Sequence, residues 1–82
     1  MEPTDIYFLA LPGTLMLDLA GVSEPFKLAN RFGGKFSLHF VGPKSDLTTH
    51  SGLMIRGVED LPNKVPDGSV VFVPGVVVND RG

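Results

Sequence analysis

Leu-Ala-Leu-Pro-Gly-Thr-Leu-Met-Leu-Asp-Leu-Ala-Gly, residues 9–21, joins the end of an apolar run to the start of a helix pattern. The apolar run over 6–11 stops at Pro12-Gly13, and from Leu15 onward apolar residues recur at helical spacing. A change of period from 2 to 3.6 residues predicts a strand, a tight turn and a helix. Because open α/β sheets bind ligands at the carboxyl ends of their strands, this corner is a candidate binding site.

The predicted helix contains a proline. Its apolar stripe consists of Leu15, Leu19, Val22, Phe26 and Ala29. Pro25 has no N–H for the carbonyl of Gly21, and its ring pushes against the same turn. We therefore expect a kinked helix after the first strand, divided at 21–23 into a short helix over 15–20 and a longer one over 24–32.

Two more strands and a hairpin are expected downstream. Residues 36–41 alternate between apolar and polar side chains, which is typical of a half-exposed edge strand. Residues 69–73 resemble the first strand, whose continuous apolar run suits a strand buried on both faces of a parallel sheet. Residues 47–50 and 53–55 flank a short polar turn and predict a hairpin or a bent excursion. Residues 61–68 are expected to form a loop.

These elements predict the α/β class. With the strands numbered along the chain, the parallel sheet should have the order 2-1-3. One helix can cover one face of a sheet, whereas parallel sheets normally carry helices on both faces. We therefore expect residues 1–82 to be an incomplete domain, the N-terminal part of a larger one. The alternatives are a complete small α+β domain with a scaffold or interaction role, or a dimer that covers its own open face.

The order 2-1-3 places a topological switch point between the first and third strands. Leu11-Pro12-Gly13 and Val73-Pro74-Gly75 should then face each other across a crevice, with Asp18 as the acid nearest to it on a rigid element. The helix dipole stabilises an acid in the first turn by ~0.3 to 1 kcal/mol, and this effect alone can account for the presence of Asp18 there. A facing group that raises its pKa would make it a proton shuttle. The N–H that follows Gly75, that of Val76, is a candidate for binding an anion.

Composition excludes several classes of function for this segment. The formal charge is −2 and the pI is about 5.5, so there is no basic surface for nucleic acid. The absence of cysteine removes disulfides, thiolate metal sites and a cysteine nucleophile from these residues. We expect His39 and His50 to face solvent, and we expect neither a metal nor a cofactor. Without a signal peptide or an apolar run of ~20 residues, a cytoplasmic location without membrane contact is predicted.

Several segments together resemble the start of the class I glutamine amidotransferase-like, PfpI-type superfamily. They are residues 8–13 (FLALPG), 17–21 (LDLAG), 24–30 (EPFKLAN), 40–43 (FVGP), 51–53 (SGL) and 73–75 (VPG). The closest likeness is to the N-terminal domain of AraC-type transcriptional regulators that carry such a module ahead of a helix-turn-helix region. The resemblance extends from about residue 5 to 78, and LDLAG with the downstream LAN is its most specific part.

The resemblance implies a partial flavodoxin-like fold, a homodimer and, in the enzymes, a cysteine nucleophile on a turn beyond the third strand. In those enzymes the acid at the place of Asp18 faces the cysteine, and the loop at the place of Gly75 helps to form the oxyanion site. It also implies a small-molecule ligand at Pro12, Gly13, Asp18, Pro74, Gly75 and Val76.

Two functions follow from this resemblance. The first is a non-catalytic ligand-sensing module of an AraC-type regulator, with DNA bound through a C-terminal region. The second is the N-terminal part of a stand-alone PfpI-type enzyme, such as an isocyanide hydratase-like hydro-lyase, with Asp18 as a catalytic acid.

Overall fold

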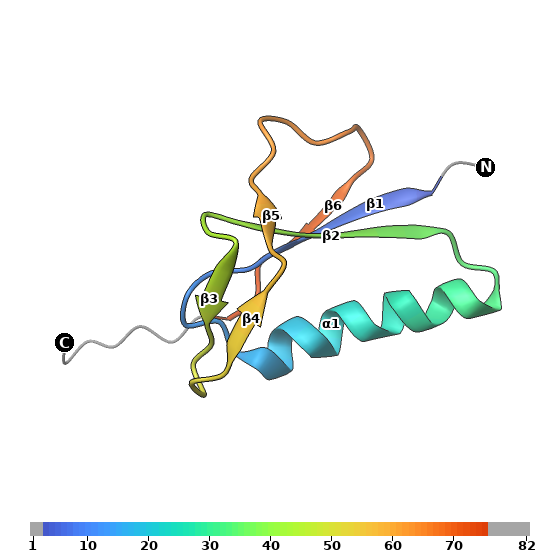
Figure 1. Cartoon of the computed structure of the whole chain (residues 1–82). Coiled ribbons are helices and arrows are strands. Elements are labelled where there is room, and N and C mark those ends of the chain that lie inside the picture. The colour runs from blue at the N-terminus through green and yellow to red at the C-terminus, as the bar shows by residue number, and fades with distance from the viewer. Residues whose placement is uncertain (1–2, 76–82) are drawn as a thin grey trace.

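One helix packs on a four-stranded parallel sheet, and a small antiparallel hairpin lies at the end of the sheet where the helix begins (Figure 1). The computed structural model describes residues 3–75. Its elements are β1 (Thr4–Leu9), α1 (Met16–Ala29), the 3-10 helix η1 (Asn30–Phe32), β2 (Phe36–Gly42), β3 (Asp46–Thr48), β4 (Met54–Arg56), β5 (Glu59–Asp60) and β6 (Val70–Phe72). The α/β class expected from the sequence is therefore confirmed.

The sheet has the order β5-β2-β1-β6, and all of its neighbouring strands are parallel. The strands expected at 36–41 and 69–73 thus lie on opposite sides of the first strand. The expectation of an edge strand over 36–41 is wrong at its carboxyl end, because the end of β2 pairs with β5. β5 has two acidic residues and no apolar pattern, so periodicity gives no sign of it. The hairpin is confirmed as β3 and β4.

The core lies between α1 and one face of the sheet and is centred on Phe8, which is fully buried. Its ring stacks on Phe40 at 5.1 Å and on Phe72 at 5.6 Å between ring centroids, one on each neighbouring strand. Phe26 of α1 completes the group at 6.3 Å from Phe8. Aromatic side chains contribute large buried areas, so this cluster supplies much of what binds the helix to the sheet.

The helix is continuous from Met16 to Ala29 with Pro25 inside it, so the expected division at 21–23 is wrong. Gly21 and Pro25 are both exposed, which leaves the lost hydrogen bond on the solvent side of the helix, where water can bind the carbonyl. Leu19 and Phe26 lie on either side of the expected break and pack into the same core. Their burial favours one helix over two.

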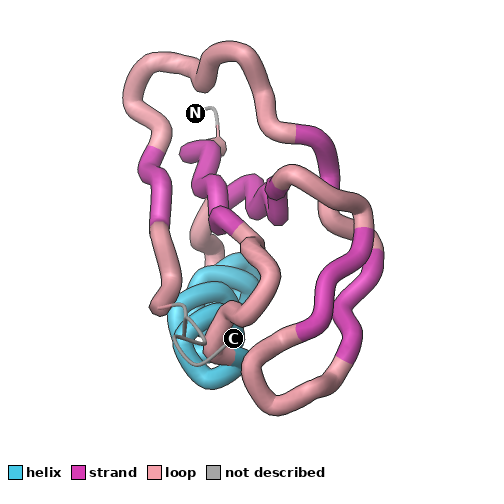
Figure 2. Tube along the Cα trace, turned by 90° about the vertical axis from the view of Figure 1, so that its left-hand side faces the viewer, coloured by secondary structure: helices cyan, strands magenta, loops and turns pink. Residues whose placement is uncertain are grey.

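The face of the sheet opposite α1 carries no helix among residues 3–75, and the chain between β5 and β6 passes over it (Figure 2). Val71 of β6 lies on this face and is 53% exposed. His39 also lies there, but it is half-buried rather than free in solvent as expected. Its Nε2 lies 2.9 Å from Asp5 Oδ1, and its ring stacks on Tyr7. His50 is exposed, as predicted.

Replacing the central phenyl ring should lower stability far more than replacing an exposed one. Phe8→Ala removes a buried ring with contacts on three elements, and we expect it to lower the free energy of unfolding by about 3 to 5 kcal/mol. Leu53→Ala, at an exposed position of the hairpin, is the control and should change it by less than ~0.5 kcal/mol. Urea denaturation followed by circular dichroism measures both, and equal losses would contradict the assigned core.

Candidate functional site

The turn after β1 is built around the side chain of Thr14, which is fully buried. Its hydroxyl donates to the Leu11 carbonyl at 2.6 Å, and its Oγ1 accepts the Leu11 N–H at 3.0 Å. Gly13 has a φ of 83°, a conformation that favours glycine. Thr14 therefore closes this turn instead of capping α1, whose N-cap residue Leu15 has no side-chain hydrogen bond.

Asp18 connects the start of α1 to the chain that follows β6. The Gly75 N–H donates to Asp18 Oδ2 at 3.0 Å, and the Leu15 N–H donates to the Gly75 carbonyl at 2.9 Å. A Cβ on residue 75 would lie 2.6 Å from Asp18 Oδ2, so any larger residue here would displace the Asp18 carboxylate. The structure thus brings together two of the predicted site residues, which are 57 positions apart in the chain.

A small hollow of about 160 Å³ lies beside this contact. Its lining is Asp18, Val22, Phe72, Val73, Pro74 and Gly75. Val22 and Phe72 are core residues, so the hollow reaches from the helix start toward the aromatic cluster. It combines apolar walls with one carboxylate, which is an arrangement that can bind a small polar molecule.

Pro12 and Gly13 do not line this hollow. The hairpin covers their turn: the Gly13 N–H donates to the Thr48 carbonyl at 2.9 Å, and the His50 N–H donates to the Thr14 carbonyl at 3.0 Å. Pro12 instead borders a separate hollow against the hairpin. The expectation that the two Pro-Gly corners face each other across one crevice is therefore wrong, because the hairpin docks on the first corner. Val76 lies outside the described residues.

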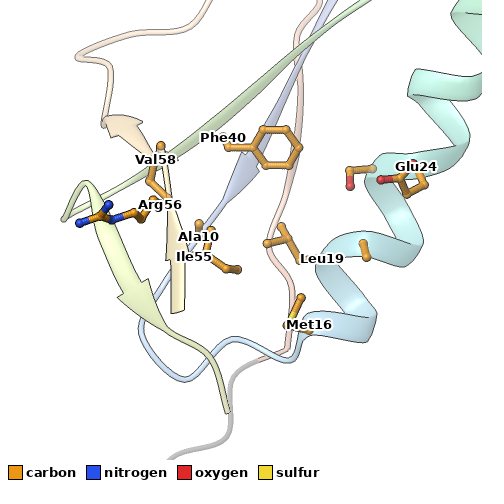
Figure 3. Close-up of a pocket in the computed structure, with 11 residues that line it drawn as sticks. Ala10, Met16, Leu19, Glu24, Phe40, Ile55, Arg56 and Val58 are labelled. Carbon is orange, nitrogen blue, oxygen red and sulfur yellow. The ribbon is translucent and has the colours of Figure 1, made fainter. Parts of the chain in front are cut away.

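A larger pocket of about 260 Å³ separates α1 from β4 and the residues that follow it (Figure 3). It is lined by Ala10, Met16, Leu19, Ala20, Ser23, Glu24, Phe40, Ile55, Arg56, Gly57 and Val58. The sequence does not indicate this pocket, because its walls meet only when the hairpin docks beside the helix. No periodic signal in the sequence reports that docking.

Within residues 3–75, no group of three histidine, cysteine, aspartate or glutamate side chains could hold a metal ion. In the same residues α1 is the longest helix, and at 14 residues it is too short to span a bilayer. The charged side chains nearest to the two pockets are Asp18 at the first and Glu24 and Arg56 at the second, and all three are exposed.

The close approach of residues 18 and 75 can be tested by a double-mutant cycle. Gly75→Ala displaces the Asp18 carboxylate from the Gly75 N–H, and we expect it to lower the free energy of unfolding by about 1 kcal/mol. In an Asp18→Ser background the same change should cost at least ~0.5 kcal/mol less. Gly21→Ala is the control: no atom lies within 4 Å of its added Cβ, and alanine stabilises a helix by about 0.5 to 1 kcal/mol. An equal cost of Gly75→Ala in both backgrounds would contradict the contact.

Comparison of the chain with family models, with curated proteins and with solved structures found no match in any of the three.

Proposed function

We propose that this chain is the N-terminal part of a flavodoxin-like, amidotransferase-like (PfpI-type) domain that senses a small molecule in an AraC-type transcriptional regulator. The observation that carries the proposal is the Asp18–Gly75 contact, which lies where the chain leaves β6 and α1 begins. Open α/β sheets bind ligands at the carboxyl ends of their strands. The cytoplasmic location expected from the sequence belongs to the same proposal.

The contact is suited to report the presence of a ligand. It is a hydrogen bond in an exposed position, and such a bond contributes only about 1 kcal/mol to stability. A ligand with a hydrogen-bond donor competes with the Gly75 N–H for the Asp18 carboxylate. Binding would thereby release the chain after β6 from the start of α1, and this change can reach a DNA-binding region C-terminal to the domain.

The sequence encoded after codon 82 distinguishes the proposed regulator from the alternative enzyme. A regulator should continue into a basic helix-turn-helix region, and the intact product should shift DNA from its own promoter in a gel mobility assay. Asp18→Asn weakens an acceptor and should change the response to the ligand while leaving DNA affinity in its absence within about twofold. A frame that instead encodes an elbow cysteine and then ends, together with turnover that Asp18→Asn abolishes, would establish the enzyme.

The outer face of α1 supports the expected homodimer. Leu17, Leu28 and Phe32 are 83%, 55% and 83% exposed, and with Gly21 and Pro25 they form a stripe at helical spacing. Apolar stripes of this kind mark interaction surfaces. The outer side of α1 faces away from the sheet in Figure 1. The open Gly21 position permits close approach of another helix.

The charges on α1 favour a second copy of the same chain, packed antiparallel. Asp18 lies in the first turn of the helix, whereas Lys27 and Arg31 lie in its last turn and in η1. A two-fold axis near the middle of the stripe brings Asp18 of one helix toward the basic end of the other. A parallel arrangement would place like charges together. Two-fold interfaces are self-complementary in this way.

Charge introduced into the stripe should prevent this dimer. We expect Leu17→Glu to shift the sedimentation coefficient of the intact protein to that of a monomer at concentrations where the unmodified protein is dimeric. Leu53→Glu makes the same change at an exposed leucine of the hairpin and should leave the dimer intact. A dimer that survives Leu17→Glu, or an unmodified protein that stays monomeric at ~100 μM, would disprove this interface.

A further inference from the structure

One peptide unit, the one that joins Thr14 to Leu15, connects the hairpin to the chain that follows β6. Its carbonyl, that of Thr14, accepts the His50 N–H at 3.0 Å, and its N–H, that of Leu15, donates to the Gly75 carbonyl at 2.9 Å. Because a peptide unit is planar, its carbonyl and its N–H turn together about the chain. A rotation that breaks one of these two hydrogen bonds therefore breaks the other as well.

The hairpin presents its side of this connection in a fixed orientation. Thr49 is 3% exposed, and its N–H and its hydroxyl both donate to the Leu53 carbonyl at 2.8 Å. The backbone groups on either side of Thr49 make the docking contacts: the Thr48 carbonyl accepts the Gly13 N–H, and the His50 N–H donates to the turn after β1. The end of the hairpin is thus closed on itself and holds the turn from which α1 begins (Figure 1).

Two hydrogen bonds of different kinds hold residue 75 on the other side. The bond from the Gly75 N–H ends on the exposed Asp18 carboxylate, where a ligand can compete for it. The bond to the Gly75 carbonyl comes from the backbone N–H of Leu15. A ligand that displaces the first bond leaves the second in place, so release of the chain after β6 requires that both are broken.

We infer that docking of the hairpin controls the release of residue 75 from the start of α1. With the hairpin docked, the peptide between Thr14 and Leu15 is held in the orientation that binds the Gly75 carbonyl. With the hairpin undocked, this peptide can turn, and a ligand at Asp18 has one bond fewer to break. As regulation of the Asp18 site the inference rests on the proposed function, whereas the coupling itself involves neither ligand nor DNA.

Amide hydrogen exchange of the intact protein, followed residue by residue by nuclear magnetic resonance, tests the coupling. His50→Pro removes the N–H that binds the Thr14 carbonyl, and His50→Ala, the matched control, retains it. We expect the Leu15 amide to exchange at least about fivefold faster in His50→Pro than in His50→Ala. This increase should exceed that of the amides of β1, which report on unfolding of the whole sheet.

The reverse experiment leaves the hairpin unchanged. Asp18→Ala removes the acceptor of the Gly75 N–H, and because coupling between two sites is reciprocal, the His50 amide should then exchange at least about threefold faster. Glu24→Ala makes the same change at another exposed acid of α1 and should alter this exchange by less than about twofold. This pair of variants decides the question by itself if His50→Pro does not fold.

Two results in folded protein would overturn the inference. One is equal exchange of the Leu15 amide in both His50 variants, and the other is unchanged exchange of the His50 amide in Asp18→Ala. Failure of the proposed sensor would appear in the ligand and DNA measurements instead and would leave these exchange rates as they are.

Discussion

The ring of Phe8 is the contact on which the other parts of this fold depend. It is fully buried, and it stacks on one phenylalanine from each neighbouring strand while α1 packs over it. Phe8, Phe40 and Phe72 occupy the same level of the register. A shift of any strand by one residue would turn its phenylalanine to the opposite face, so burial of these rings fixes the register.

The register in turn positions the candidate sites. The three strands are parallel and aligned at their phenylalanines. The carboxyl ends of β1 and β6 therefore lie side by side at the same end of the sheet. Residues 15 and 18, at the start of the helix, then lie within hydrogen-bond distance of Gly75. The Asp18 contact is therefore a consequence of core packing some distance away. Thr14, by closing the turn after β1, sets the direction in which α1 departs.

Local patterns in the sequence predicted the elements that depend on local signals. The apolar run of β1, the alternation of β2 and the polar turn of the hairpin were sufficient for their strands. The pattern failed at Pro25, where burial of Leu19 and Phe26 outweighs the loss of one solvent-side hydrogen bond. It also failed for β5, which forms through backbone pairing of two acidic residues to the end of β2.

The candidate site, too, could be predicted only where local signals determine it. Asp18 and Gly75 could be selected because an acid after a turn and a glycine after a strand are visible in the sequence. The separation of the two Pro-Gly corners could not be predicted, because it results from backbone hydrogen bonds between the hairpin and residues 13 and 14. That docking leaves the hollow beside Asp18 with one Pro-Gly corner, Pro74-Gly75, and places Pro12 at a separate hollow against the hairpin. The order of the strands can therefore select the residues at a strand end, but it cannot say which of them a later segment of the chain will cover.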